Sequence, residues 1–184
     1  MPNWCVNKVI VEGPEEMLSE FLKCSFEEEK EGKLFVFEAV DPKGKWENTK
    51  HLNSELKEML GEEWMSWGVT CNPYVFEQEI IEQTPTRFYI EFKTRWSPPC
   101  RWAENVIVQE RFKDLKVTVA YCEAGMDFYG SISVRKGEIQ KVHGEIGESL
   151  KYIEDENNKI EQVIHWDTPF GEFVKKWEFI DFGG

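Results

Sequence analysis

The chain has 184 residues, a length that suits one domain or one domain with an appended element. It carries 35 acidic and 22 basic residues, and the net charge of −13 disfavours broad binding to phosphate backbones. Its five cysteines are scattered without a CxxC pair, which excludes a disulfide framework and a zinc-site spacing. No stretch approaches the roughly 18 apolar residues of a membrane span. We therefore expect a soluble, cytoplasmic protein that contacts no membrane.

The amino-terminal part predicts a strand, a turn and a helix. Residues Cys5–Glu12 alternate and are rich in β-branched side chains, as is typical of a strand. Gly13 ends this strand, and Pro14 suits the first turn of a helix whose apolar stripe runs to about Lys23. The acidic run Glu27–Glu31 that follows is predicted to be a solvated loop.

Two further segments precede a predicted hairpin. Leu34–Val40 is a candidate strand, and Asn48–Leu60 has the leucine spacing of a helix. Tyr74–Ile81 and Arg87–Arg95 are predicted to pair around a turn at residues 83–86, because the second segment alternates cleanly between apolar and polar side chains.

The remaining elements follow from the same rules. Ser97–Pro99 is predicted to end the preceding strand and to begin a helix that runs to Asp114. Four strands are predicted after it, at Lys116–Cys122, Phe128–Lys136, Ile139–His143 and Gln162–Trp166. A final helix is predicted at Phe170–Trp177. The polar segment Asp155–Lys159 is predicted to be a turn.

This order of elements predicts an α+β fold, a ferredoxin-like βαββαβ two-layer sandwich with an inserted helical segment and a carboxy-terminal extension. We expect residues 1–137 to form the ferredoxin-like domain, with residues 26–70 inserted. Residues 138–184 would pack on the same domain as an acidic extension, since they carry eleven acidic and five basic side chains. Residues 85–136 carry nine basic and six acidic side chains, so the central unit is mildly basic.

Several ordered motifs resemble the ferredoxin-like domain family of YubB-type proteins, which plasmids and phages encode. The motifs are Met1–Cys5 with Asn7, Val11–Pro14, Trp64–Gly68, Thr94–Pro99 with Trp102, Phe112–Leu115 and Gly125–Gly130. The similarity covers roughly residues 1–25 and 64–137, and the family's usual Thr-Lys-Trp after Gly68 is replaced here by Val69-Thr70-Cys71-Asn72. The resemblance implies a ferredoxin-like fold and a mobile-element source, but a fold carries no activity with it.

The Trp96–Pro99 segment has two interpretations. Consecutive prolines make a rigid corner at the end of a strand, which can simply aim the following helix. Alternatively, Trp96 and Trp102 form a rim of rigid aromatic groups that contacts a ligand or partner at the end of the sheet.

Acidic residues of the central unit are the candidate catalytic groups. Asp127, Glu123 and Glu91 belong to the predicted sheet, and Arg95 lies beside them. Paired carboxylates can hold a divalent metal and assist phosphodiester cleavage, so these four residues define an alternative in which the protein is an enzyme acting on RNA or nucleotides. Their spacing follows no fixed motif, and Asp127 in a glycine-rich turn is also suited to bond backbone groups. Our first interpretation therefore includes no cofactor and no metal.

The central unit also contains candidate RNA-binding cations and a candidate nucleophile pair. Lys93, Arg95 and Arg101 can contact single-stranded RNA on an exposed sheet face, although exposed cations on a strand also prevent sheet-to-sheet association. Cys122 and His143 are candidates for a nucleophile pair, since such pairs are spatial and not sequential.

The acidic segments support the first functional hypothesis. Their residues are Glu27, Glu28, Glu29, Glu31, Glu154, Asp155 and Glu156. A small acidic protein can occupy a basic nucleic-acid channel, because its carboxylates stand where phosphates would. Together with the mobile-element resemblance, this predicts a binding protein that counters a host defence system, for instance an anti-CRISPR inhibitor of a nucleic-acid-guided nuclease. Its partner would be a host protein or ribonucleoprotein with a basic surface. The competing hypotheses are the RNA-directed or nucleotide-directed enzyme and an accessory or assembly module.

Overall fold

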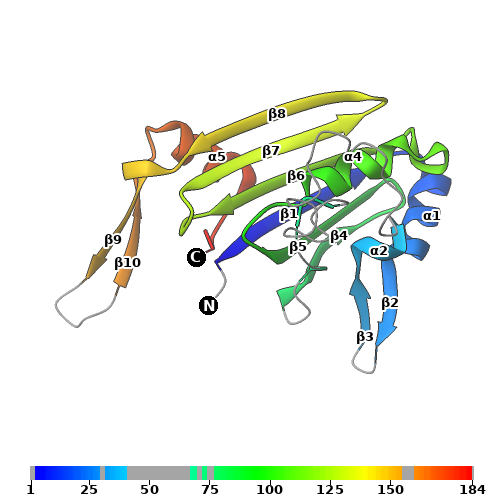
Figure 1. Ribbon diagram of the computed structural model, residues 1–184, viewed down its shortest axis with the longest axis horizontal. Helices are drawn as coiled ribbons and strands as arrows, with labels where there is room; N and C mark the ends of the chain where they lie inside the picture. The colour runs from blue at the N-terminus through cyan, green and yellow to red at the C-terminus, as the bar shows by residue number, and fades with distance from the viewer. Residues whose placement is uncertain are drawn as a thin grey trace, which may run out of the picture.

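A six-stranded sheet forms the centre of the computed structural model, which describes residues 3–29, 32–40, 67–69, 72–73, 77–154 and 160–183. The strand order is β4-β5-β1-β6-β7-β8, and every neighbouring pair is antiparallel (Figure 1). The strands are β1 (Trp4–Glu12), β4 (Glu79–Gln83), β5 (Arg87–Arg95), β6 (Lys116–Glu123), β7 (Phe128–Arg135) and β8 (Glu138–Glu145). The helices are α1 (Glu15–Ser25), α2 (Phe37–Val40), α4 (Cys100–Val108) and α5 (Pro169–Trp177), with short 3-10 turns η3 (Glu110–Phe112) and η4 (Gly147–Ser149).

The predicted ferredoxin-like fold is confirmed by the connectivity of six elements. In chain order these are β1, α1, β4, β5, α4 and β6, which is the βαββαβ sequence, and their strands lie in the order β6-β1-β5-β4. β7 and β8 extend the sheet beyond β6 as a further hairpin, so residues 138–145 continue the same sheet. Among the described residues, no helix is both long enough and apolar enough to cross a bilayer.

One face of the sheet, which we call the helical face, is covered by α1 and α4 and holds the larger core. Strand alternation directs the apolar side chains of β1, β5 and β6 toward this face, for example Val9, Ile90 and Val119. The helices bury matching apolar stripes, which include Leu18 and Phe21 of α1. The alternation read from the sequence therefore sets which side chains form the core.

The opposite face, which we call the α5 face, is covered at one end only. The carboxy-terminal segment buries its aromatic side chains there. In this segment, α5 begins at Pro169, and the hydroxyl of the preceding Thr168 caps the helix by accepting a hydrogen bond from the Gly171 N–H at 3.1 Å. The side chains of this second core are Val6, Ala120, Cys122, Tyr129, Ile146, Leu150, Phe170, Phe173, Val174, Phe179 and Phe182. The rest of the α5 face carries mostly polar side chains, together with Ile10 and Val142, and none of the described helices covers it fully.

Two hairpins stand apart from the sheet: β2 (Phe26–Glu29) with β3 (Gly32–Phe35), and β9 (Leu150–Glu154) with β10 (Ile160–Ile164). The prediction of a solvated loop at Glu27–Glu31 is therefore wrong for Glu27–Glu29, which pair with β3. The predicted strand Leu34–Val40 ends at Phe35 and is followed by α2. The predicted helix Asn48–Leu60 and turn Asp155–Lys159 lie outside the described residues.

A buried polar network joins the motifs that carry the family resemblance. The Asn7 amide donates hydrogen bonds to the Cys5 carbonyl and to the Thr94 hydroxyl, both at 2.8 Å, and Asn7 and Thr94 are fully buried. The Thr94 hydroxyl donates to the Ser97 carbonyl at 2.7 Å, and the Ser97 hydroxyl donates to the Gly68 carbonyl at 2.7 Å. These motifs therefore hold β1, β5 and the following corner together, since buried polar groups must be hydrogen-bonded.

Candidate functional site

The predicted catalytic acids do not come together in one site. Glu91 lies on the α5 face, where it pairs with Lys8, whereas the alternation of β6 places Glu123 on the helical face. Asp127 is exposed in the turn after β6, and its Oδ1 accepts a hydrogen bond from the Gly147 N–H at 2.6 Å. Among the described residues, no group of three or more His, Cys, Asp and Glu could hold a metal ion. The paired-carboxylate hypothesis is therefore not supported.

The predicted Cys122–His143 pair is also separated by the sheet. Cys122 belongs to the core of the α5 face, where burial raises the pKa of its thiol. His143 lies on the helical face of β8, and its Nδ1 is 3.4 Å from the Tyr121 hydroxyl. The two side chains thus point to opposite faces and cannot act together.

Glu123 is buried at the end of β6 with only one of its oxygens satisfied. Its Oε1 accepts a hydrogen bond from the Gly125 N–H at 2.9 Å, whereas Oε2 has no partner among the described residues. Burial raises the pKa of this carboxyl, while hydrogen bonds from the backbone of Gly125 and Met126 act in the opposite direction. Ionisation of Glu123 is therefore less favourable in the folded state than in the unfolded state.

We expect Glu123→Gln to remove a stability loss that the wild type suffers as the pH rises. A carboxyl whose pKa is higher in the folded state than in the unfolded state destabilises the fold increasingly from the unfolded pKa, about 4.3, up through the folded pKa. The variant should therefore gain stability relative to wild type as the pH increases from about 4 through the folded-state pKa of Glu123. Thermal unfolding across this range measures the difference, with the exposed Glu79→Gln as control. A difference that stays constant with pH would contradict the prediction.

Trp102 does not form the predicted aromatic rim. Its side chain is fully buried on the inner side of α4, so it cannot contact a partner on the surface of the folded protein. Trp96 is 45% exposed at the end of β5, where it adopts a left-handed backbone conformation with φ of 60°. Trp96 alone therefore remains as an accessible residue of the predicted rim.

The three cations predicted to contact RNA are engaged separately. Lys93 forms ion pairs with Glu77 at 2.6 Å and Asp181 at 2.8 Å, which tie β5 to the carboxy-terminal segment. The Arg95 guanidinium lies 5.9 Å from the centre of the Trp4 ring. Arg101 lies in the first turn of α4, beside Gly68. The described contacts do not bring these cations into one basic surface.

The acidic partner-binding residues map to the two projecting hairpins. Glu27 and Glu28 are exposed on β2, which Glu29 ends, and Glu154 ends β9, while Glu31, Asp155 and Glu156 lie outside the described residues. In the view of Figure 1 both hairpins point downward, β2–β3 on the right and β9–β10 on the left. Glu28 forms an exposed ion pair of 3.9 Å with Lys33, which neutralises little of this charge.

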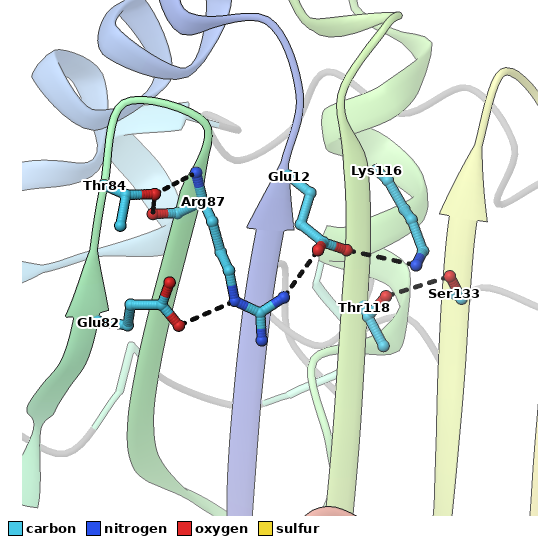
Figure 2. Close-up of polar contacts among 7 residues, drawn as sticks. All are labelled: Glu12, Glu82, Thr84, Arg87, Lys116, Thr118 and Ser133. Carbon is cyan, nitrogen blue, oxygen red and sulfur yellow. Dashed lines mark hydrogen bonds and ion pairs between the residues drawn. The ribbon is translucent and has the colours of Figure 1, made fainter.

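A polar groove lies on the open part of the α5 face, and the sequence did not predict it. It has a volume of about 410 Å³ and lies between the sheet and the end of α5. Glu12 lines it, and the Glu12 carboxylate binds the Arg87 guanidinium of β5 at 2.7 Å and the Lys116 ammonium of β6 at 3.3 Å (Figure 2). Its other polar lining residues are Thr118, Ser131, Ser133, Gln140 and Lys176.

The electrostatics of the groove follow from this row of charges. Partial burial acts to lower the pKa of Arg87, but hydrogen bonds and charge interactions with Glu82 and Glu12 raise it. The Thr118 and Ser133 hydroxyls are 3.1 Å apart and lie beside Lys116 (Figure 2). A sequence signal exists, because polar residues alternate with apolar ones at Lys116 and Thr118 of β6 and at Ser131, Ser133 and Arg135 of β7, but it does not reveal that Arg87 joins them.

The connectivity and the two-layer packing define a ferredoxin-like α+β protein. Residues 75–164 match the family model described as "Ferredoxin-like domain in Api92-like protein". This range runs from just before β4 to the end of β10, so β1 and α1 complete the fold from outside it. No curated protein and no solved structure is significantly similar to the chain.

Proposed function

We propose that this protein is a binding protein that presents two acidic β-hairpins to a basic surface of its partner. The observation that supports the proposal is the projection of β2–β3 and β9–β10 from the sheet, each built from an acid-rich segment (Figure 1). Residues 26–35 and residues 150–164 each contain four acidic and two basic side chains. Glu27 and Glu28 are exposed on β2, so their carboxylates are available to cations of another molecule.

The partner that fits this chemistry is a nucleic-acid enzyme whose groove is lined by Lys and Arg. Carboxylates on the hairpins would take the place of phosphates, and the overall charge of −13 would steer the encounter. The resemblance to plasmid-encoded and phage-encoded proteins favours a target in the cytoplasm of a bacterial host. We therefore favour a counter-defence function, such as anti-CRISPR inhibition of a nucleic-acid-guided nuclease.

Charge reversal on β2–β3 tests the proposal. We expect Glu27→Lys/Glu28→Lys to lose the partner that the wild-type protein captures from a host lysate and to bind it at least about tenfold more weakly at low salt. Captured proteins and nucleic acids are identified at about 0.05 M and about 0.3 M salt, since screening weakens contacts between exposed charges. Calorimetry with the purified partner then gives the affinity.

The matched control is Glu79→Lys/Glu145→Lys, which makes the same change in net charge on the two edge strands of the sheet. Glu79 and Glu145 are exposed and form no ion pair among the described residues. The control should retain the partner. Equal loss of partner binding in both variants would show that binding depends on net charge and not on the hairpin. Unchanged binding of the hairpin variant would overturn the role of β2–β3.

A further inference from the structure

The groove on the α5 face is lined mainly by positive charges, although the protein as a whole is negative. Its lining contains the cations Arg87, Lys116 and Lys176 but only one carboxylate, Glu12. A second hollow of about 550 Å³ shares Glu12 and Lys116 with the groove and adds Arg135, Lys136 and Asp114. Five cations and two carboxylates therefore line these two adjoining hollows, and Glu82, which binds Arg87, adds a third carboxylate beside them, in a chain whose net charge is −13. Such a local reversal concentrates anions at this site.

Within the part of the chain that the structure describes, the cations of the groove have hydrogen-bond donors without a protein partner. Arg87 has five N–H donors, of which Nη1 and Nε are bound by Glu12 and Glu82 at 2.7 Å and 2.9 Å. Lys116 has three donors and one ion pair, at 3.3 Å. Lys176 lies over the Trp177 ring at 5.3 Å, and Arg135 has no ion pair among the described residues. The charge network thus orients these groups without saturating them.

The floor of the groove supplies neutral hydrogen-bonding groups next to the cations. Ser131 and Ser133 of β7 and Thr118 of β6 present hydroxyls, and Gln140 of β8 presents an amide. The Trp177 side chain lines the same groove. Ammonium and guanidinium donors beside hydroxyls suit phosphate oxygens, whereas an amide and an aromatic ring suit the edge and face of a base.

From this arrangement we propose that the groove and its neighbouring hollow bind the phosphate groups of a nucleotide or of a short single-stranded nucleic acid. Because the two hollows share Lys116, the side-chain cations of one hollow follow those of the other. This arrangement fits a ligand with repeated phosphates better than a single anion. The site uses Arg87, Lys116, Arg135 and Lys176. It does not depend on the acidic hairpin β2–β3, because that hairpin packs against the helical face.

The test compares two variants with the same loss of charge. Lys176→Gln/Arg135→Gln removes two cations from the site, and Lys175→Gln/Lys151→Gln removes two exposed cations outside it. Binding of fluorescent oligouridine of about eight nucleotides is measured by anisotropy at several salt concentrations. The site variant should bind about tenfold more weakly than wild type, with a salt slope reduced by about one, and the control should bind within about twofold. Thermal unfolding verifies that both variants are folded.

Two further arms separate the possible ligands. Competition by AMP or ATP as strong as that by oligouridine identifies a nucleotide site, and much stronger competition by oligouridine identifies a single-stranded nucleic-acid site. Both results support the proposal. Equal loss of binding in the two variants, or no binding of any phosphate-bearing probe, would overturn it. Preferential binding of an oligoglutamate peptide would also overturn it, in favour of an acidic protein segment.

Discussion

Replacing Trp102 with alanine is expected to lower the free energy of unfolding by about 3–5 kcal/mol. Trp102 is fully buried, and its ring centroid lies 6.2 Å from that of Phe21, 5.6 Å from that of Phe35 and 5.1 Å from that of Phe37. It thereby joins α4 to α1, to hairpin β2–β3 and to α2. Removing it would leave a cavity where three segments meet, so the loss should be close to the upper end for a core substitution. Urea unfolding gives the value from the midpoint and slope.

Trp102→Phe keeps the effect measurable if the alanine variant does not fold. The Nε1 of Trp102 has no hydrogen-bond partner among the described residues, so phenylalanine removes an unpaired donor while it retains most of the ring contacts. We expect a loss of about 1 kcal/mol or less for this change. The exposed Trp96→Phe serves as control. Stability that is unchanged in Trp102→Ala would contradict the core assignment and restore Trp102 as a surface contact.

Replacing Lys8 with methionine is expected to cost about 2–4 kcal/mol of stability. The Lys8 ammonium lies beneath the carboxy-terminal segment, where it contacts the Glu91 carboxylate at 2.6 Å, the Tyr89 hydroxyl at 3.1 Å and the Glu178 carbonyl at 3.2 Å. Only 5% of the Lys8 side chain and 25% of the Glu91 side chain are exposed. Without Lys8, Glu91 would hold a partly buried charge without its cation, and this accounts for most of the expected cost.

A double-mutant cycle separates this penalty from the value of the pair. Adding Glu91→Gln to Lys8→Met should recover at least half of the lost stability, because the neutral amide removes the uncompensated charge while it still accepts a hydrogen bond from Tyr89. The exposed Lys113–Glu110 pair is the matched control, and Lys113→Met should leave the stability nearly unchanged. Equal losses for Lys8→Met and Lys113→Met would show that burial of the first pair has no energetic consequence.

Much of the fold can be predicted because its elements have strong local periodicity. The alternation in β1 and β5 and the apolar spacing of α1 are local properties, and the structure has these elements within a few residues of their predicted bounds. The hairpin β2–β3 is predicted less well, because the acidic run Glu27–Glu29 is typical of a solvated loop. The apolar residues Phe26 and Phe35, which are paired in the hairpin, are a weaker signal of a strand. Those two residues pack on the core and leave Glu27 and Glu28 exposed on the strand.

The candidate sites are much harder to predict than the fold. Residues selected for their chemistry, Glu91, Glu123 and Asp127, are separated because the two faces of a sheet and its connecting turns divide side chains that are close in the sequence. The residue type of Trp102 does not distinguish surface from interior, because tryptophan suits contact surfaces as well as cores. Its burial depends on α1, α2 and β3, which come from a different part of the chain.

The sequence by itself determined the ferredoxin-like order of elements and the acidic character of the flanks, because both are properties of contiguous segments. Only the tertiary structure decided which charged groups share a surface. Glu12 is paired in register with Arg87 on one side and with Lys116 on the other, although these residues are 75 and 104 positions away from it. Strand register is set by packing of the whole hydrophobic face, so no local pattern around any one of the three residues contains this information.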